Sequence, residues 1–157
     1  MRLIQAPQLL RTNKILEQYT SDVNFTIDAY KCKFTKKQRK QFQDKGIYTY
    51  IKLALNISFP DYKFDDLELI DIKKSDINQV KDTLSFRLNN LLSNYESGVE
   101  NALLTVFDSV MDIKNSSIYL IDKRLEMFCL VGWFTCFFLY NKKRKRLLLC
   151  VVTASKN

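Results

Sequence analysis

The chain has 157 residues, and its apolar share of 46% is enough for one continuous core in a single domain. Lysine and arginine number 25 against 17 acidic residues, which gives a net charge of +8 and favours an acidic partner: nucleic acid, anionic lipid or an acidic protein face. The chain has no histidine, so it lacks the Ser-His and Cys-His nucleophile pairs and the commonest zinc ligand. Its three glycines are too far apart for a phosphate-binding loop, and its four cysteines form no Cys-x-x-Cys pair. We therefore expect a binding domain in a reducing compartment, not an enzyme, with no metal or cofactor.

The first half of the chain shows both helical and strand periodicities. Apolar residues between 9 and 19 indicate a short amphipathic helix, and residues 23–29 alternate as a strand with one buried face does. The apolar set then shifts by one residue to Tyr30, Cys32 and Phe34, so either a bulge re-aims the strand or both of its faces are covered. Residues 46–58 have helical spacing, which Pro60 ends.

The second half predicts two further helices and then several strands. Residues 67–72 are typical of a short strand, and apolar residues from Ile77 to Tyr95 recur every three or four positions. Ser97 and Glu100 form a capping-box pattern before the second of these two helices. Strands are expected near residues 117–122, 128–140 and 145–153, and the apolar stretch 127–140 is too short to span a bilayer. The fold class is therefore α+β, an antiparallel sheet of about five strands covered by helices.

A few residues are candidates for contacts with a partner. A run of five cations follows Tyr140 and Asn141, and it is either a solvated turn, a nuclear import signal or a contact for an acidic partner: Lys142, Lys143, Arg144, Lys145 and Arg146. A second basic cluster is partly strand and partly loop: Lys31, Lys33, Lys36, Lys37, Arg39, Lys40 and Lys45. Trp133 is either core or, if exposed, an interface anchor. Pro60, Asp61 and Tyr62 turn the chain after a helix and are also interface candidates.

Several segments resemble the Maf-one (Maf1) family, the repressors of transcription by RNA polymerase III. Residues 55–64, Leu-Asn-Ile-Ser-Phe-Pro-Asp-Tyr-Lys-Phe, are similar to the family's middle signature, although the arginine usual between Phe59 and Pro60 is missing. Residues 133–146 match the family's Trp, Tyr-Asn-Lys and Lys-Arg positions in register. Residues 27–33 and 107–119 also resemble family segments, so the likeness covers most of the chain.

The resemblance implies one Maf-one-like domain over residues 1–157 that lacks the family's usual disordered insert, acidic loop and acidic tail. It also implies a nuclear protein, shuttling to the cytoplasm, that binds the RNA polymerase III clamp region. TFIIIB is a second candidate partner, because the implied action is to block recruitment of the polymerase by that factor. The five cations at residues 142–146 would meet an acidic patch, and no membrane contact is expected.

Two other classes of function stay open. The same cations could bind nucleic acid, with Tyr30, Tyr48 and Tyr50 as surfaces on which bases stack. This alternative predicts steeply salt-dependent binding to nucleic acid without polymerase. A ligand-sensing or enzymatic α+β domain is the third class, because fold alone does not determine function.

Overall fold

The computed structural model describes residues 1–19, 22–42, 46–88 and 99–156. These residues form a single domain built on a six-stranded sheet in which all neighbouring strands are antiparallel. Across the sheet the order is β1 (Arg2–Leu3), β2 (Val23–Lys31), β6 (Arg146–Ser155), β5 (Val131–Asn141), β4 (Ser117–Ile121) and β3 (Ile72–Ser75). The predicted α+β class is confirmed. The strand beyond the expected five is β1, which pairs with the end of β2.

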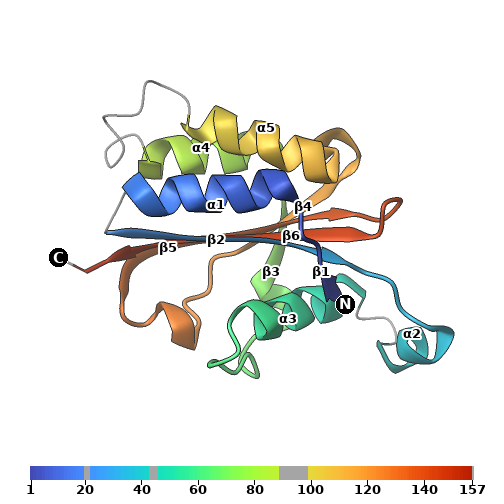
Figure 1. Ribbon diagram of the computed structural model, residues 1–157. Helices are drawn as coiled ribbons and strands as arrows, with labels where there is room; N and C mark the ends of the chain where they lie inside the picture. Colours follow the sequence, from blue (N-terminus) through green and yellow to red (C-terminus); the bar gives the residue numbers. More distant parts are fainter. Residues whose placement is uncertain (20–21, 43–45, 89–98, 157) are drawn as a thin grey trace.

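Helices cover both faces of this sheet (Figure 1). One face carries α1 (Pro7–Tyr19), α4 (Ile77–Leu88) and α5 (Val99–Met111), and the other carries α3 (Gly46–Ser58), with α2 (Lys36–Phe42) nearby. The apolar residues accordingly divide into two cores, and neighbouring residues of β5 serve different ones: Phe137 packs with the first set of helices and Phe138 with α3. This two-sided burial explains why β6 is buried from Leu147 to Val152 without alternation.

Both faces of strand β2 are covered, and this accounts for the one-residue shift in its apolar pattern. Ala29 lies in the core under α1 and α5, whereas Tyr30 lies in the core beside α3, and both are fully buried. The pairing of β2 with β6 runs from Val23 to Lys31 without a change of register, so no bulge is needed. A hydrogen-bond chain links β2 to α3, because the Tyr30 hydroxyl pairs with Ser58 Oγ, which donates to Asp28 Oδ2 at 2.9 Å.

The strand predicted at residues 67–72 is wrong over most of its length. Leu69–Asp71 is a 3-10 helix, and the strand begins at Ile72. Asp71 Oδ2 accepts a hydrogen bond from the Glu68 N–H at 2.8 Å, which closes a turn that competes with the extended backbone. Leu69 and Ile70 are exposed, so their apolar character does not report burial.

The four predicted helices are present as α1, α3, α4 and α5, with α3 at the expected bounds. Val80, Leu84 and Leu88 are the buried stripe of α4, and the predicted continuation through Leu91 and Tyr95 lies outside the described residues, as does Ser97. Short 3-10 helices form at Ile113–Asn115 and Glu126–Phe128, and the second of these delays the start of the predicted strand 128–140 to Val131. Within the described ranges, no helix has the length and apolar character to cross a bilayer.

Candidate protein-binding surface

The predicted basic run forms the turn between β5 and β6. Lys142, Lys143, Arg144 and Lys145 are exposed, and Arg146 opens β6. The Arg144 N–H donates to Asn141 Oδ1 at 2.9 Å, and Lys145 adopts the left-handed backbone conformation with a φ of 53°. The Lys145 carbonyl accepts the Cys32 N–H at 2.7 Å, which fixes the turn against the chain that leaves β2. The side chains of residues 142–145 are thereby presented outward from an ordered turn.

Arg146 differs from the four cations before it because it is half-buried and has a structural contact. Its Nη1 donates to the Val110 carbonyl at 2.8 Å, and Asn141 Nδ2 donates to the Met111 carbonyl at 2.8 Å. Both carbonyls belong to the last turn of α5, where the helix has no further N–H groups to offer. Asn141 and Arg146 are paired across β5 and β6, so together they cap α5 from the sheet.

A row of cations crosses three strands beside this turn. The register places Arg2 opposite Lys31, and Lys31 opposite Arg146, so the three side chains leave the same face of the sheet. Together with Leu3, Ile4 and Gln5 they line a cavity of about 430 Å³. The pKa of Lys31 is lowered, first by the charge of Lys33, then by partial loss of water, and further by Arg146, Arg2 and Lys145. Like charges directly opposite one another destabilise a sheet, so this row is a cost to folding.

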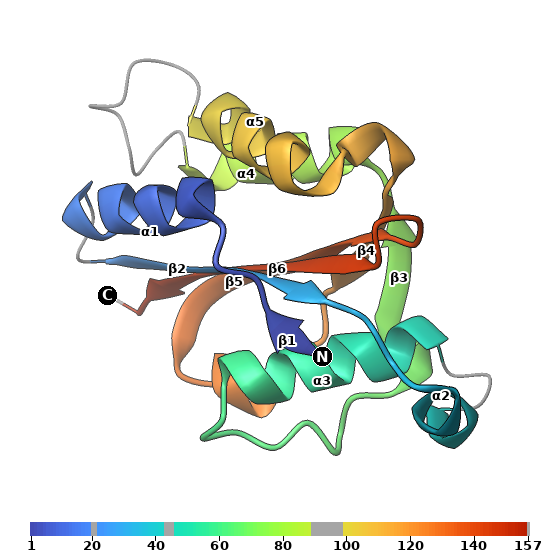
Figure 2. The same cartoon turned by 45° about the vertical axis from the view of Figure 1, so that its right-hand side comes forward.

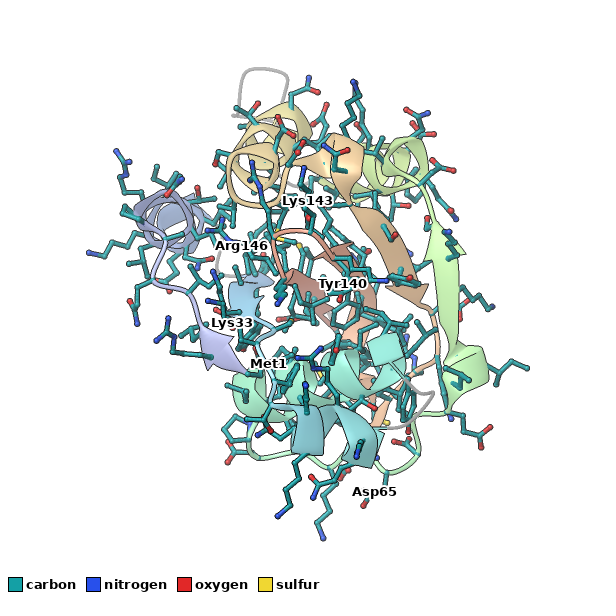
Figure 3. All side chains as sticks on the ribbon, turned by 90° about the vertical axis from the view of Figure 1, so that its right-hand side faces the viewer. Met1, Lys33, Asp65, Tyr140, Lys143 and Arg146 are labelled. Atoms are coloured by element: carbon teal, nitrogen blue, oxygen red, sulfur yellow. The ribbon has the colours of Figure 1, made fainter. Side chains whose placement is uncertain are left out.

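We give the name basic end to the row of cations, the β5–β6 turn and two neighbouring cations, Lys33 and Arg39. Its residues are Arg2, Lys31, Lys33, Arg39, Lys142, Lys143, Arg144, Lys145 and Arg146. In Figure 3, which looks onto this end, the labelled Lys33, Lys143 and Arg146 lie in the middle of the view, and Asp65 lies apart from them. The ion pairs found among the described residues are elsewhere: Lys52 with Asp65, Lys73 with Asp122, and Lys123 with Asp71. The basic end is therefore a concentrated, unneutralised positive surface.

A small pocket opens on the α3 side of the basic end. Three aromatic residues and Cys32 form its walls, and three cations stand around it; the seven residues are Cys32, Phe34, Arg39, Tyr50, Tyr140, Lys142 and Lys145. The pocket has a volume of about 220 Å³. We refer to it as the aromatic pocket. Burial raises the pKa of the Tyr140 hydroxyl to about 12, with smaller contributions from Tyr50, Cys32 and Tyr119.

Trp133 does not belong to the basic end. It lies near the start of β5, seven residues before Tyr140, which in a strand is about 23 Å away. Its ring is half-buried against the core under α4 and α5, and the Arg87 guanidinium stands over it at 5.0 Å from the ring centre. Both residues line a cavity of about 420 Å³. That Trp133 contacts a partner stays a prediction. Any such contact would be made at the surface beside Arg87 and not at the β5–β6 turn.

Pro60, Asp61 and Tyr62 are also separate from the basic end. All three are exposed in the turn after α3, where the Tyr62 N–H donates to the Phe59 carbonyl at 3.2 Å. The end of α3 lies below the sheet, well apart from the β5–β6 turn at the right, in both ribbon views (Figures 1 and 2). The nine residues predicted as one interface thus occupy three places.

Part of the surface escaped prediction because it depends on strand pairing. Arg2 was not singled out, since nothing in the sequence indicates a strand at residues 2 and 3 or its pairing with Lys31. The stacking role considered for Tyr30 is wrong, because that ring is fully buried and its hydroxyl is bound to Ser58. Tyr48 and Tyr50 are half-buried, and the Tyr48 hydroxyl donates to the Leu67 carbonyl at 2.7 Å.

Known structures show that this arrangement of strands and helices is a Maf1-type fold. Two crystal structures of citrus MAF1 are similar to the chain with TM-scores of 0.72 and 0.71, at 21% and 20% sequence identity. The first match covers 95% of this chain and 99% of the citrus chain, and the second covers 97% and 98%.

The sequence comparisons lead to the same family. Two uncharacterized proteins of Encephalitozoon cuniculi are each 25% identical over 154 residues, which cover 95% of this chain and of each relative. A sequence model described as the Maf1 regulator matches residues 40–151. The chain belongs to the Maf1 regulator family, and its general role is that of a regulator.

Proposed function

We propose that this chain represses transcription by RNA polymerase III: it binds the clamp region of the polymerase and blocks recruitment of the polymerase by TFIIIB. Membership of the Maf1 family supports the regulatory part of this proposal. The basic end supports the mode of binding, because a dense positive surface attracts and orients an acidic one. Repression of this kind is steric and electrostatic and involves no catalysis.

The observation that carries the proposal is the row formed by Arg2, Lys31 and Arg146. In the free protein the three charges repel one another. The pKa of Lys31 is lowered first by Lys33 and by partial loss of water, and further by Arg146, Arg2 and Lys145. Arg146 also caps α5, but the repulsion within the row is a cost to folding, and an acidic partner would convert it into attraction. Departures from favourable charge placement are typical of functional surfaces.

The proposal includes a place in the cell. Polymerase III transcription is nuclear, so we propose a nuclear protein that also shuttles to the cytoplasm. Lys142, Lys143, Arg144 and Lys145 are exposed in the turn and are available to an import receptor when the polymerase is not bound. Fusion of residues 1–157 to a fluorescent protein tests this, and exclusion from the nucleus would contradict it.

The experiment for the main proposal is a retention assay on the immobilised chain. Nuclear extract treated with nuclease is passed over it, and the bound fraction is probed for RNA polymerase III. Purified chain is then added to a promoter-dependent polymerase III transcription reaction. We expect retention of the polymerase and a fall in transcript yield; polymerase in the flow-through together with undiminished transcription would refute the proposal.

Nucleic-acid binding is the second candidate, and the basic end itself favours it, because phosphate groups would neutralise the same cations. The burial of Tyr30 removes one of the three expected stacking surfaces. The nuclease step separates the two candidates. Retention of polymerase that disappears after nuclease treatment would support nucleic-acid binding in place of direct contact.

A further inference from the structure

The aromatic pocket is the part of the basic end whose shape selects a ligand. The residues that line it come from four separate places in the chain: Phe34 just after β2, Arg39 in α2, Tyr50 in α3 and Tyr140 at the end of β5. Its volume of about 220 Å³ is below the range of about 300–1,000 Å³ typical of pockets that enclose whole small ligands. A single side chain is an occupant of suitable size.

The aromatic rings of the pocket are already in place. Tyr50 contacts both of the other rings: its centre is 5.0 Å from that of Phe34 in a stacked arrangement, and 5.7 Å from that of Tyr140 in a tilted one. Cys32 beside them is 6% exposed. Because the rings pack on one another, the pocket needs no rearrangement before an apolar group enters it, which lowers the entropic cost of binding.

The rim of the pocket is strongly positive. Arg39, Lys142 and Lys145 stand around it with exposed side chains, and none of the ion pairs found in the described part of the chain involves them. An occupant with carboxylates on both sides of an apolar group would satisfy wall and rim together. A purely acidic segment would leave the apolar walls in water.

We propose that the aromatic pocket receives one aromatic side chain from an acidic segment of a partner protein, with carboxylates before and after it meeting Arg39, Lys142 and Lys145. This inference rests on the proposed function, which supplies an acidic partner protein: the pocket would be the place where that partner is anchored. A nucleic acid is the less favoured occupant, because stacking of a base needs a free ring face. One face of the Tyr50 ring is already stacked on Phe34, and the Tyr140 ring contacts Tyr50 at a tilt of 54°.

The test uses two fluorescently labelled heptapeptides and the full chain. One peptide has a central phenylalanine between three acidic residues on each side, and the other has alanine in its place. Burial of a phenylalanine ring predicts at least about tenfold tighter binding of the first peptide in an anisotropy titration. In the Phe34→Ala variant we expect this preference to fall to less than about twofold, because one wall is missing. Lys142→Gln with Lys145→Gln should weaken both peptides and leave the ratio between them unchanged.

Several results would overturn the inference: equal affinity of the two peptides for the wild-type chain, an undiminished preference in Phe34→Ala, or displacement of the phenylalanine peptide by a phosphorylated dT oligomer at lower concentration than by unlabelled peptide. Thermal unfolding of each variant shows that it is folded, and the wild-type comparison of peptides needs no variant at all. The outcome is separable from that of the proposed function. A chain that retains polymerase III without preferring the phenylalanine peptide lacks the anchor, and a chain with the preference but no retention binds some other acidic protein.

Discussion

Asn141 and Arg146 show how single residues of the basic run contribute to the fold. Asn141 is 1% exposed and uses both ends of its amide, donating to the Met111 carbonyl and accepting from the Arg144 N–H. Replacement by alanine removes one of two hydrogen bonds to the Met111 carbonyl, which also accepts from Ser116 Oγ, and it takes away the acceptor of the Arg144 N–H, which loosens the turn. We expect Asn141→Ala to lower the free energy of unfolding by about 1–3 kcal/mol, measured by urea denaturation.

Arg144→Ala is the matched control for this change. The Arg144 side chain is exposed, and its hydrogen bond to Asn141 uses the backbone N–H, which alanine keeps. We expect a change within about 0.5 kcal/mol, as for an ordinary surface position. If both variants unfold at the same urea concentration as the wild type, the cap on α5 contributes nothing to stability.

The four cysteines differ sharply in their surroundings. Cys32, Cys136 and Cys150 are buried and Cys129 is exposed. Burial raises the pKa of the Cys32 thiol from 9.0 to about 12 and raises those of Cys136 and Cys150 as well. At pH 8 a thiol reagent such as Ellman's should therefore titrate one thiol of the native chain rapidly and all four after denaturation. Rapid reaction of several thiols in the native chain would contradict this burial.

The same thiols make stability depend on pH in the alkaline range. In the unfolded chain a thiol ionises near its ordinary pKa of 9.0, whereas in the folded chain Cys32 stays neutral up to about 12. The stabilisation is therefore complete below pH 9 and declines as the pH rises from 9 towards 12. A urea midpoint that falls over this range, and falls less in Cys32→Ala, is the expected result.

At the level of elements, the sequence predicts best where one periodicity acts alone. The helix at 46–58 was predicted with its bounds, because Ile51 and Leu55 bury one side and Pro60 forbids continuation. The strand predicted at residues 67–72 is wrong for two reasons. Two of its apolar residues are exposed, and the hydrogen bond from the Glu68 N–H to the Asp71 side chain closes a turn there. Local patterns cannot show such competition between a side chain and the strand ladder.

The β5–β6 turn offers a prediction at this scale through Lys145. Its φ of 53° lies in the left-handed region, which glycine adopts without strain and a β-branched residue does not. Lys145→Gly should therefore change the free energy of unfolding by no more than about 1 kcal/mol, because relief of the left-handed conformation offsets the gain in unfolded-state entropy. Lys145→Val should lower the melting temperature clearly, and equal melting temperatures for the two variants would contradict the assigned turn.

For the molecule as a whole, the sequence indicated the basic turn but not the surface to which it belongs. The run at residues 142–146 is visible in the sequence, and family resemblance added its role as an expectation. Arg2 and Lys31 join Arg146 only through the registers of β1, β2 and β6, which connect residues more than a hundred positions apart. Trp133 lies in the same family segment as the run and Pro60 lies in another, and the fold places both away from the turn: Trp133 contacts Arg87, and Pro60 is exposed after α3.

The central claim is that the basic end, and not net charge in general, holds the polymerase. The decisive measurement compares two triple variants of equal charge in binding to purified RNA polymerase III at low and at physiological salt. One is Lys142→Glu, Lys143→Glu and Lys145→Glu; the control replaces the exposed Lys14, Lys63 and Lys81 by Glu. Arg146 is left in place because it caps α5. We predict that the first variant associates at least about tenfold more slowly at low salt and that the control stays within about threefold of the wild type; equal losses in the two variants, or none in the first, would contradict the claim.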